Sequence, residues 1–337
     1  MRIITLSLLL CGLVIQSFGV RPPLKGYTYA SEQAPTGKEW QSPENLALNK
    51  EQPHAWFFPF QDIKSARKVL PENSIYWQSL NGNWKFNWAA DPDSRPKDFY
   101  KTDFDVTAWD NIPVPSSWNI YGVQQDGSLK YGVPIYVNQP VIFMHSVKAD
   151  DWRGGVMRTP PTNWTTYKYR NEVGSFRREF EIPEHWDRRE VFISFDGVDS
   201  FFYLWINGMY VGFSKNSRNT ANFNITNYLR SGKNIVAAEV YRNSDGSFLE
   251  AQDMFRLPGI FRTVALYSTP KVQIRDLVAT PDLDNNYTDG SLTIQADIRN
   301  FGKKTAKGYK VCYSLYANKL YSDENEPVIL ATDTKGA

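Results

Sequence analysis

The stretch SFFYLWINGMYVGFS, residues 200–214, places two apolar runs on either side of Asn207-Gly208. Aromatic and β-branched residues favour strands, and Asn-Gly between two such runs is a strong signal of a tight hairpin turn. We therefore predict two antiparallel strands joined at Asn207-Gly208.

Further strand patterns surround this hairpin. Apolar and charged residues alternate in GSFRREFEI (174–182), and EVFISFDGV (190–198) and FRTVALYST (261–269) are further strand candidates. A strand is also expected in SLNGNWKFNW (79–88), with a turn at Asn81-Gly82, and the stretch 108–122 reads as a loop leading into a short strand. Short strands at roughly 10-residue spacing with few helices predict an all-β domain, a β-sandwich or jelly roll.

A second series of strand patterns begins after Pro270. The runs 272–283, 290–300 and 308–318 alternate apolar with polar residues, and 327–337 is a fourth candidate. An immunoglobulin-like sandwich has about seven strands, so we expect an incomplete domain of that type. Cys312 is expected to be packed inside its strand.

The predicted domain order therefore has four parts. They are a signal peptide (1–20), an extended N-terminal segment (21–75), a β-sandwich or jelly-roll domain (76–270) and a partial immunoglobulin-like domain (271–337). The N-terminal segment is rich in proline, with Trp40, Trp56, Phe57 and Phe58 as expected anchors and a short helix expected within 62–70.

The first 20 residues have the pattern of a secretory signal. Arg2 precedes an apolar run, and Ser17 and Gly19 supply small residues for cleavage. Leu10 is a poor residue to precede a lipid-modified Cys11, so lipidation is the less favoured alternative. We expect export to the periplasm or the extracellular space, with no membrane span.

Composition excludes several classes of function. The net charge is +2, which gives no basic field for nucleic acid, and the three histidines are scattered without metal-ligand spacing. Phosphate-binding and dinucleotide-binding motifs are absent from the sequence. The aromatic content of 15% suits β-sheets and also surfaces that stack against sugar rings.

The stretch SDGSFLEAQDMFRLPGIFR, residues 244–262, combines three carboxylates with three phenylalanines. We interpret it as a long loop between strands, of the kind that is usually functional or well packed. Its acids suit sugar hydroxyls or a hard cation. They also suit a purely structural role, in which Asp245 caps a turn and Glu250 pairs with Arg256 or Arg262. Sequence spacing alone assigns no acid/base pair here.

Several motifs in order resemble the N-terminal part of glycoside hydrolase family 2 β-galactosidases. They cover most of residues 40–270 and are EWQSPENLALNKEQPHAWFFPF (39–60), SLNGNWKF (79–86), WDNIPVPSSWNIYG (109–122), PIYVN (134–138), the run 195–226 and the stretch 244–262. The resemblance implies that residues 76–270 are a jelly-roll sugar-binding domain. It also implies a retaining hydrolase of terminal β-galactosides, with its two catalytic glutamates in a barrel. That barrel is missing from the 337 residues, so the chain is expected to carry no catalytic residue.

The resemblance also implies two substrate-binding residues. Asp253, in the QDM motif, is expected to bind a galactosyl hydroxyl and a sodium ion. Asn138, in PIYVN, is expected to contact the galactose, although Val137 replaces the family's usual threonine. The resembled enzyme uses sodium and magnesium, of which only the sodium ligand is expected in this chain. Glu250, Arg256 and Arg262 are expected to brace the loop.

The resemblance leaves other roles open. The segment 139–173 looks like an addition, and it would either shape a site for longer glycans or pack on the missing barrel. Expected partners are a β-galactoside or galactose-containing glycan, the barrel of the same polypeptide and a homo-oligomer. The alternatives are a stand-alone carbohydrate-binding β-sandwich, a β-mannosidase or β-glucuronidase relative, and a β-sandwich without a ligand.

Overall fold

The computed structural model of the protein describes residues 35–134, 171–250, 254–317 and 328–336. They form two compact units, one holding the described residues from 35 to 53 and 57 to 269, the other holding 54–56 and the described residues from 270 onwards. Each is described by itself. The predicted signal peptide and most of the segment 139–173 lie outside the described residues.

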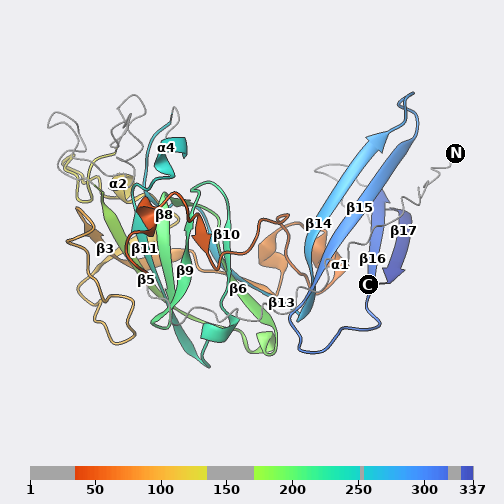
Figure 1. Ribbon diagram of the computed structural model, residues 1–337, viewed down its shortest axis with the longest axis horizontal. Helices are drawn as coiled ribbons and strands as arrows, with labels where there is room; N and C mark the ends of the chain where they lie inside the picture. The colour runs from red at the N-terminus through yellow and green to blue at the C-terminus, as the bar shows by residue number, and fades with distance from the viewer. Residues whose placement is uncertain (1–34, 135–170, 251–253, 318–327, 337) are drawn as a thin grey trace. The chain divides into compact units, whose positions relative to one another are not determined.

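The larger unit is built on two antiparallel sheets (Figure 1). The first has the strand order β1-β9-β8-β11-β5-β3-β4 and the second the order β10-β6-β13-β2. The strands of the first sheet are β1 (Ala47–Leu48), β9 (Met209–Lys215), β8 (Phe201–Ile206), β11 (Lys233–Tyr241), β5 (Val173–Glu181), β3 (Gly82–Ala89) and β4 (Asp110–Val114). Those of the second are β10 (Ala221–Asn224), β6 (Glu190–Phe195), β13 (Val264–Thr269) and β2 (Trp77–Ser79). The all-β prediction is confirmed.

Strand β8 shows why the first sheet is buried on both faces. Successive side chains of a strand point to opposite faces, and all six residues of β8 are buried. Phe202, Leu204 and Ile206 belong to the core between the two sheets, together with residues of β6 and β13. Phe201, Tyr203 and Trp205 belong to a second apolar cluster on the other face.

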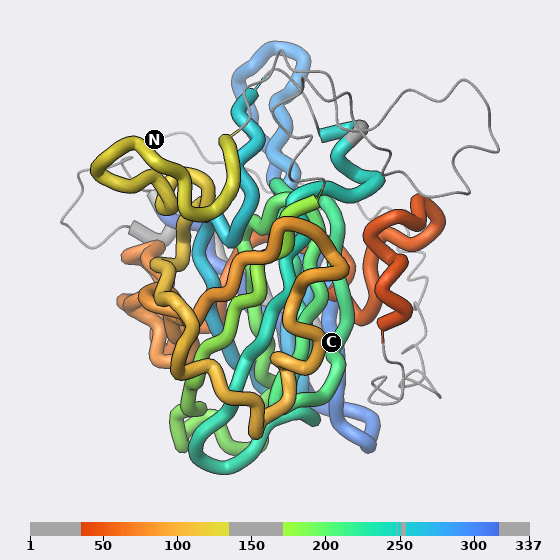
Figure 2. Tube along the Cα trace, turned by 90° about the vertical axis from the view of Figure 1, so that its left-hand side faces the viewer, coloured from red at the N-terminus to blue at the C-terminus, as the bar shows by residue number. Residues whose placement is uncertain are grey.

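The second cluster is covered by two segments outside the sheets. The connection from β3 to β4 contributes Phe99 and partly buried Trp109, and it runs across the face of the sheet in yellow-orange in Figure 2. The N-terminal segment contributes Trp40, whose ring stacks on that of Tyr241 at 5.5 Å between centroids. The high aromatic content is therefore largely used to cover a central sheet on both faces.

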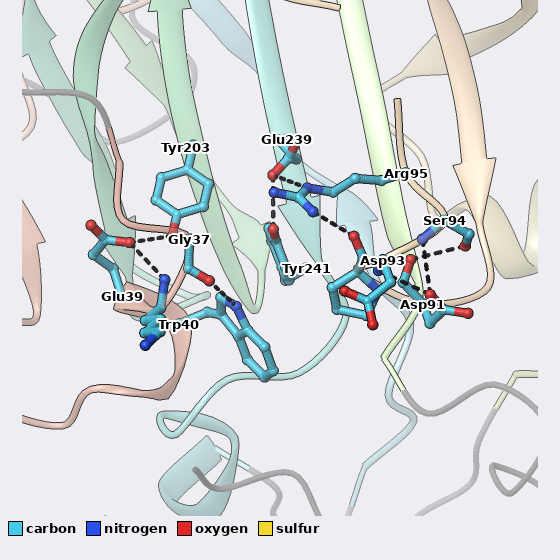
Figure 3. A network of polar contacts seen from close by, with 12 residues as sticks. Gly37, Glu39, Trp40, Asp91, Asp93, Ser94, Arg95, Tyr203, Glu239 and Tyr241 are labelled. Atoms are coloured by element: carbon cyan, nitrogen blue, oxygen red, sulfur yellow. Dashed lines mark hydrogen bonds and ion pairs between the residues drawn. The ribbon is translucent and has the colours of Figure 1, made fainter. Parts of the chain in front are cut away.

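Polar contacts hold these covering segments to the sheet (Figure 3). The Tyr203 hydroxyl donates to Glu39 at 2.5 Å. Arg95 pairs with Glu239 of β11 at 2.9 Å, and the same carboxylate oxygen accepts from Tyr241 at 2.8 Å. Of the other expected anchors, Phe58 packs edge-on against Tyr267, whereas Trp56 is 58% exposed.

The predicted hairpin at Asn207-Gly208 is confirmed. β8 ends at Ile206 and β9 begins at Met209, and both turn residues have positive φ, 52° and 81°. These angles are those of the type I′ turn that the twist of a hairpin favours. The Asn207 side chain also donates to the carbonyl of Tyr228 at 2.8 Å, which ties the turn to the core.

The strand expected in 79–88 is confirmed as β3, which begins at Gly82, and β2 ends at Ser79 before the predicted turn. The Asn81 side chain accepts from the Val264 amide at 2.9 Å and donates to Thr263 at 3.2 Å. One local prediction was wrong in part. The stretch 108–122 holds strand β4 first and then the short helix α2 (Trp118–Tyr121). The short helix expected within 62–70 is α1 (Ile63–Ala66), with the Asp62 side chain accepting from the Ser65 amide.

The remaining short elements connect these sheets. They are η1 (Glu39–Gln41), η2 (Pro71–Asn73), η3 (Glu184–Trp186), η4 (Thr226–Tyr228), α4 (Ser247–Glu250) and the strand pair β7 (Val198–Asp199) with β12 (Gly259–Ile260). No helix in the described ranges is long and apolar enough to cross a membrane.

The smaller unit contains two hairpins. β14 (Val272–Leu283) pairs with β15 (Gly290–Asn300), and β16 (Lys310–Ala317) pairs with β17 (Val328–Gly336). Strands in all four predicted regions are confirmed. Cys312 is exposed, contrary to prediction, because it lies on the outward-facing side of an alternating strand whose other face carries Val311, Tyr313 and Leu315.

Candidate functional site

The two predicted sugar contacts, Asn138 and Asp253, lie outside the described residues. The structure instead describes the chain on either side of each. Glu250 and Met254 flank the segment that contains Asp253, and Pro134 begins the PIYVN motif. The candidate site is therefore built from the residues that hold these flanking positions.

The chain on either side of residues 251–253 is clamped by Lys215, the last residue of β9, and by Ser217 and Arg218, which follow it. Lys215 pairs with Asp245 at 2.8 Å, and both side chains are almost completely buried. Ser217 donates its amide to Glu250 at 2.7 Å and its hydroxyl at 2.5 Å, and Arg218 donates to the sulfur of Met254 at 3.1 Å. The three contacts attach both sides of the segment 251–253 to one strand end.

This clamp corrects the sequence-based interpretation of the stretch. Residues 247–250 form the helix α4 rather than continuous loop. Glu250 binds Ser217, not Arg256 or Arg262. Arg262 donates to the carbonyl of Arg218 at 2.8 Å, so it braces the clamp from outside.

The N-terminal segment joins the same clamp. The Lys215 ammonium donates to the carbonyl of Ser42 at 2.6 Å, and the Asp245 amide donates to the carbonyl of Trp40 at 3.0 Å. Burial lowers the pKa of Lys215, while its bond to Asp245 opposes that shift. A residue far away in sequence thus fixes the start of the Asp253-bearing stretch.

A second buried ion pair holds the approach to Asn138. Arg242 directly follows β11 and pairs with Glu172, which directly precedes β5. The same guanidinium donates to the carbonyl of Val133 at 2.8 Å. Gly132 has φ of +74°, and a Cβ atom there would lie 2.3 Å from the Glu172 carboxylate. The backbone entering PIYVN therefore rests directly on this ion pair.

Glu172 is further oriented from helix α2. One of its oxygens accepts from the indole of Trp118 at 2.9 Å and from the side-chain amide of Asn119 at 3.2 Å. Asn119 in turn donates to the carbonyl of Tyr131 at 2.5 Å. The buried Glu172 carboxylate thus has hydrogen-bond partners for both of its oxygens.

A small polar hollow lies beside both anchors. It is lined by Asp199, Arg218, Arg242, Asn243, Ser247, Glu250, Met254 and Arg256. Burial raises the pKa of Asp199 to about 6, opposed by Arg218 and supported by Glu250. The hollow thus gathers charges of both signs.

Sequence reasoning missed most of these residues. Lys215, Ser217, Arg242, Glu172 and Asp199 were not predicted as parts of a site. Arg242 and Asn243 immediately precede the stretch 244–262, so their place in the sequence could have suggested that they belong to the site. The contribution of Lys215 and Ser217 depends on a strand pairing that the local pattern does not show.

The metal prediction has no support among the described residues. They contain no group of three or more His, Cys, Asp or Glu side chains that could hold an ion. The expected sodium ligand, Asp253, is not among them, so its role stays a prediction.

Comparison with known proteins identifies the family of the domain that carries this site. The profile of the glycosyl hydrolases family 2 sugar binding domain matches residues 77–270. The chain belongs to this family. The matched range includes both anchors of the candidate site, which therefore lie within a family 2 sugar-binding domain.

Similar proteins are named β-galactosidases. That of Priestia megaterium is 42% identical over 264 residues, which cover 78% of this chain and 24% of the relative. That of Halalkalibacterium halodurans is 36% identical over 259 residues, covering 77% and 23%. The chain thus spans about a quarter of the length of these relatives. The Lactobacillus helveticus β-galactosidase large subunit is 32% identical, with coverage of 85% and 44%.

Solved structures support the fold. A β-glucuronidase from Ruminococcus gnavus in complex with D-glucaro-d-lactam aligns with a TM-score of 0.53 at 14% identity, covering 84% of this chain and 40% of that one. At this identity the similarity concerns the fold alone.

Proposed function

We propose that the chain is the N-terminal sugar-binding part of an exported β-galactosidase that hydrolyses terminal β-galactosides by a retaining mechanism. The observation that carries the proposal is the 42% identity to a β-galactosidase, which extends through the family 2 sugar-binding domain. The two catalytic glutamates would belong to a barrel beyond residue 337, since no acid of this chain is assigned to catalysis.

Within the chain, Asp253 and Asn138 are the proposed substrate contacts. Asp253 would accept from a galactosyl hydroxyl and bind sodium, and Asn138 would bind the same sugar. The described geometry supports this pairing indirectly. Arg242 contacts the backbone leading to Asn138, and the hollow that Arg242 lines is also lined by Glu250 and Met254 on either side of the Asp253 segment.

The other roles follow from the same proposal. Residues 1–20 would direct export and be removed. Magnesium would bind in the rest of the enzyme, and homo-oligomers would form from the complete polypeptide. The segment 139–173 would either lengthen the glycan site or pack on the barrel.

The second candidate is a carbohydrate-binding protein that uses this domain without catalysis, or a family 2 enzyme for another sugar. The solved structures titled β-glucuronidase share 13–18% identity with the chain, which carries no substrate preference. The greater identity to β-galactosidases favours galactose.

The test begins with the reading frame beyond codon 337. A frame that continues into a barrel with two active-site glutamates should give a product that hydrolyses aryl β-galactosides faster than β-glucuronides. In that enzyme, Asp253→Asn should lower kcat/KM by roughly 100-fold, because the substitution removes a charged hydrogen bond and a cation ligand. Asp282→Asn, on an exposed strand end, is the matched control. A stop codon at that place, or preference for glucuronides, would overturn the galactosidase proposal.

A further inference from the structure

The chain contains three Asn-x-Ser/Thr sequences, which are acceptor sequences for an N-linked glycan. They begin at Asn163, Asn224 and Asn286. Asn163 lies outside the residues that the structure describes. The other two lie in very different surroundings, so the structure separates an accessible acceptor from an inaccessible one.

Asn224 is the inaccessible acceptor. It belongs to β10 and is 3% exposed. Its side-chain nitrogen, the atom that a glycan would join, donates to Glu190 at 2.8 Å. Its side-chain oxygen accepts from the Thr226 hydroxyl at 2.7 Å, so both polar groups of the acceptor sequence are engaged within the domain. A transferase therefore has no access to this asparagine in the folded chain.

Asn286 is the accessible acceptor. It lies in the turn between β14 and β15, at the far end of that hairpin (Figure 1). All residues from 282 to 291 are exposed, and the neighbouring Tyr287 is 81% exposed. Within the described ranges, no hydrogen bond involves the side chain of Asn286, and the Thr288 hydroxyl donates to its backbone carbonyl at 3.3 Å. The asparagine and the hydroxyl of the acceptor sequence thus lie together on one exposed turn.

The turn also has a backbone that opens easily. Tyr287 has φ of +56°, a left-handed conformation that is disfavoured for a residue with a Cβ atom. The turn is closed mainly by Oδ1 of Asp284, which accepts from the amides of Thr288 at 2.7 Å and Asp289 at 3.3 Å. Because exposed hairpin tips with few buried contacts open locally at low free energy, an enzyme can draw this sequence into its own site.

An acidic residue precedes this acceptor at the position that matters. Bacterial transferases of N-linked glycans bind a carboxylate two positions before the asparagine, through charge-assisted hydrogen bonds from an arginine. Asp284 stands at that position before Asn286, and neither of the other two acceptor sequences has an acid there. The amide of Thr288 lowers the pKa of Asp284, so the carboxylate is charged at neutral pH. Exposure and the acidic residue therefore single out the same asparagine independently.

We propose that Asn286 is an N-glycosylation site of the exported chain. Export rests on the proposed function, whereas the accessibility of the acceptor does not. In the transfer, the side-chain nitrogen of Asn286 forms a bond to the anomeric carbon of a lipid-linked glycosyl diphosphate. The bond from that carbon to the diphosphate oxygen breaks, the lipid diphosphate leaves, and a carboxylate of the transferase takes the amide proton. The glycan would cover Leu283 and Tyr287, the exposed apolar side chains of the hairpin tip.

The first experiment is mass spectrometry of the chain isolated from the exported fraction of its own cells. Trypsin releases residues 276–299 as one peptide, which holds no other acceptor sequence. We expect this peptide to carry a glycan, and fragmentation should place the glycan on Asn286. An exported chain that yields only the unmodified peptide would overturn the proposal.

The second experiment tests the acceptor without export. The folded, unmodified full chain is incubated with a purified bacterial oligosaccharyltransferase and its lipid-linked glycan. Asn286→Gln and Thr288→Ala should abolish transfer, and Thr288→Ser should retain it. Asp284→Asn keeps an oxygen for the turn but removes the charge, so it should slow transfer roughly 10-fold or more. Asn285→Gln is the matched control, because it changes an exposed amide outside the acceptor sequence and should leave transfer unchanged.

The outcomes separate this proposal from the proposed function. No transfer to the wild type, or equal transfer to wild type and Asn286→Gln, would overturn the acceptor assignment. Transfer to Asn224 in the folded chain would overturn the role given to burial. Retention of the chain inside the cell would contradict the proposed export, and transfer to the purified chain would then still decide the assignment of Asn286. None of these results depends on hydrolysis of galactosides.

Discussion

The Lys215 ammonium lies 2.8 Å from Oδ1 and 2.9 Å from Oδ2 of Asp245, and the two side chains are 3% and 4% exposed. The pair joins the end of β9 to the first turn of the stretch 244–262. It also binds the N-terminal segment through the Ser42 carbonyl. A single buried charge pair thus holds three parts of the chain together.

Breaking one side of this pair should destabilise the larger unit strongly. Lys215→Met leaves the Asp245 carboxylate buried without its cation, and removal of one partner of a buried pair lowers the free energy of unfolding by about 3–5 kcal/mol. Urea unfolding followed by tryptophan fluorescence measures this change. Lys233→Met is the control, because its pair with Glu179 is exposed to solvent and should contribute little to stability.

The double variant Lys215→Met/Asp245→Leu separates pairing from packing. Removing both charges eliminates the unpaired carboxylate, so part of the lost stability should return. Equal stability of the single and double variants would show that the N-terminal segment, rather than the charge pair, carries the effect.

The backbone at Gly132 gives a second prediction. Gly132→Ala places a Cβ atom 2.3 Å from a carboxylate oxygen of buried Glu172, in addition to a φ of +74°. We expect a loss of more than about 2 kcal/mol in the free energy of unfolding, because backbone strain and displacement of a buried ion pair add together. Thermal unfolding of the folded variant measures this loss.

Gly127→Ala is the matched control for that variant. Gly127 has nearly the same φ, +80°, and nothing lies within 4 Å of its added Cβ atom. Gly127→Ala should lower the free energy of unfolding by only about 1 kcal/mol, because alanine disfavours a positive φ. If both alanine variants were equally stable, the contact with Glu172 would contribute nothing.

The fold was largely predictable because its signals are local. Asn207-Gly208 specifies its own turn, and alternation in 174–182 or 290–300 needs no distant partner to be recognised. Strand β8 illustrates a limit, because its continuous apolar run shows burial without showing which segments cover the second face. Trp40 and Phe99 provide that cover from chain positions that no local pattern connects to β8.

The site was less predictable because its supports are long-range. Ser217 binds Glu250 across 33 residues, and Arg242 binds Glu172 across 70. The sequence suggested Arg256 or Arg262 as partners of Glu250 because they are near in the chain. In the fold, the strand end that carries Ser217 is nearer.

The network around Glu239 supports a third prediction. Burial raises the pKa of Glu239, and Arg95 and Tyr241 oppose that shift. Arg95→Met should therefore raise the pKa further and lower the free energy of unfolding at pH 7 by about 2–4 kcal/mol. Because the carboxyl then takes up a proton more easily in the folded state, the loss should shrink as the pH falls towards 5.

Chemical denaturation at the two pH values checks this effect. Arg95→Met/Glu239→Gln is the control, since it has no carboxylate to protonate and its stability relative to the wild type should depend less on pH. A loss in Arg95→Met that is constant with pH would assign the effect to packing of the Arg95 stem instead.

Asp199 should make stability depend on pH in the opposite sense from most acids. Its pKa is raised from 3.8 to about 6, so between these values the folded chain holds a proton that the unfolded chain has lost. The stabilisation is present at the acidic end of that window and disappears as the pH rises through 6. Relative to Asp199→Asn, the wild type should lose about 2 kcal/mol of unfolding free energy between pH 4.5 and pH 6.5.

The control for Asp199 is an acid whose pKa is lowered, rather than raised, in the folded chain. The amide of Thr107 lowers the pKa of exposed Asp105, so the stability that Asp105→Asn removes should grow as the pH rises towards 3.8 and stay nearly constant above it. Urea unfolding of the three proteins at several pH values from about 3 to 6.5 tests both signs. A constant difference between wild type and Asp199→Asn would mean that Asp199 is ionised throughout, held by Arg218 and the other arginines of the hollow.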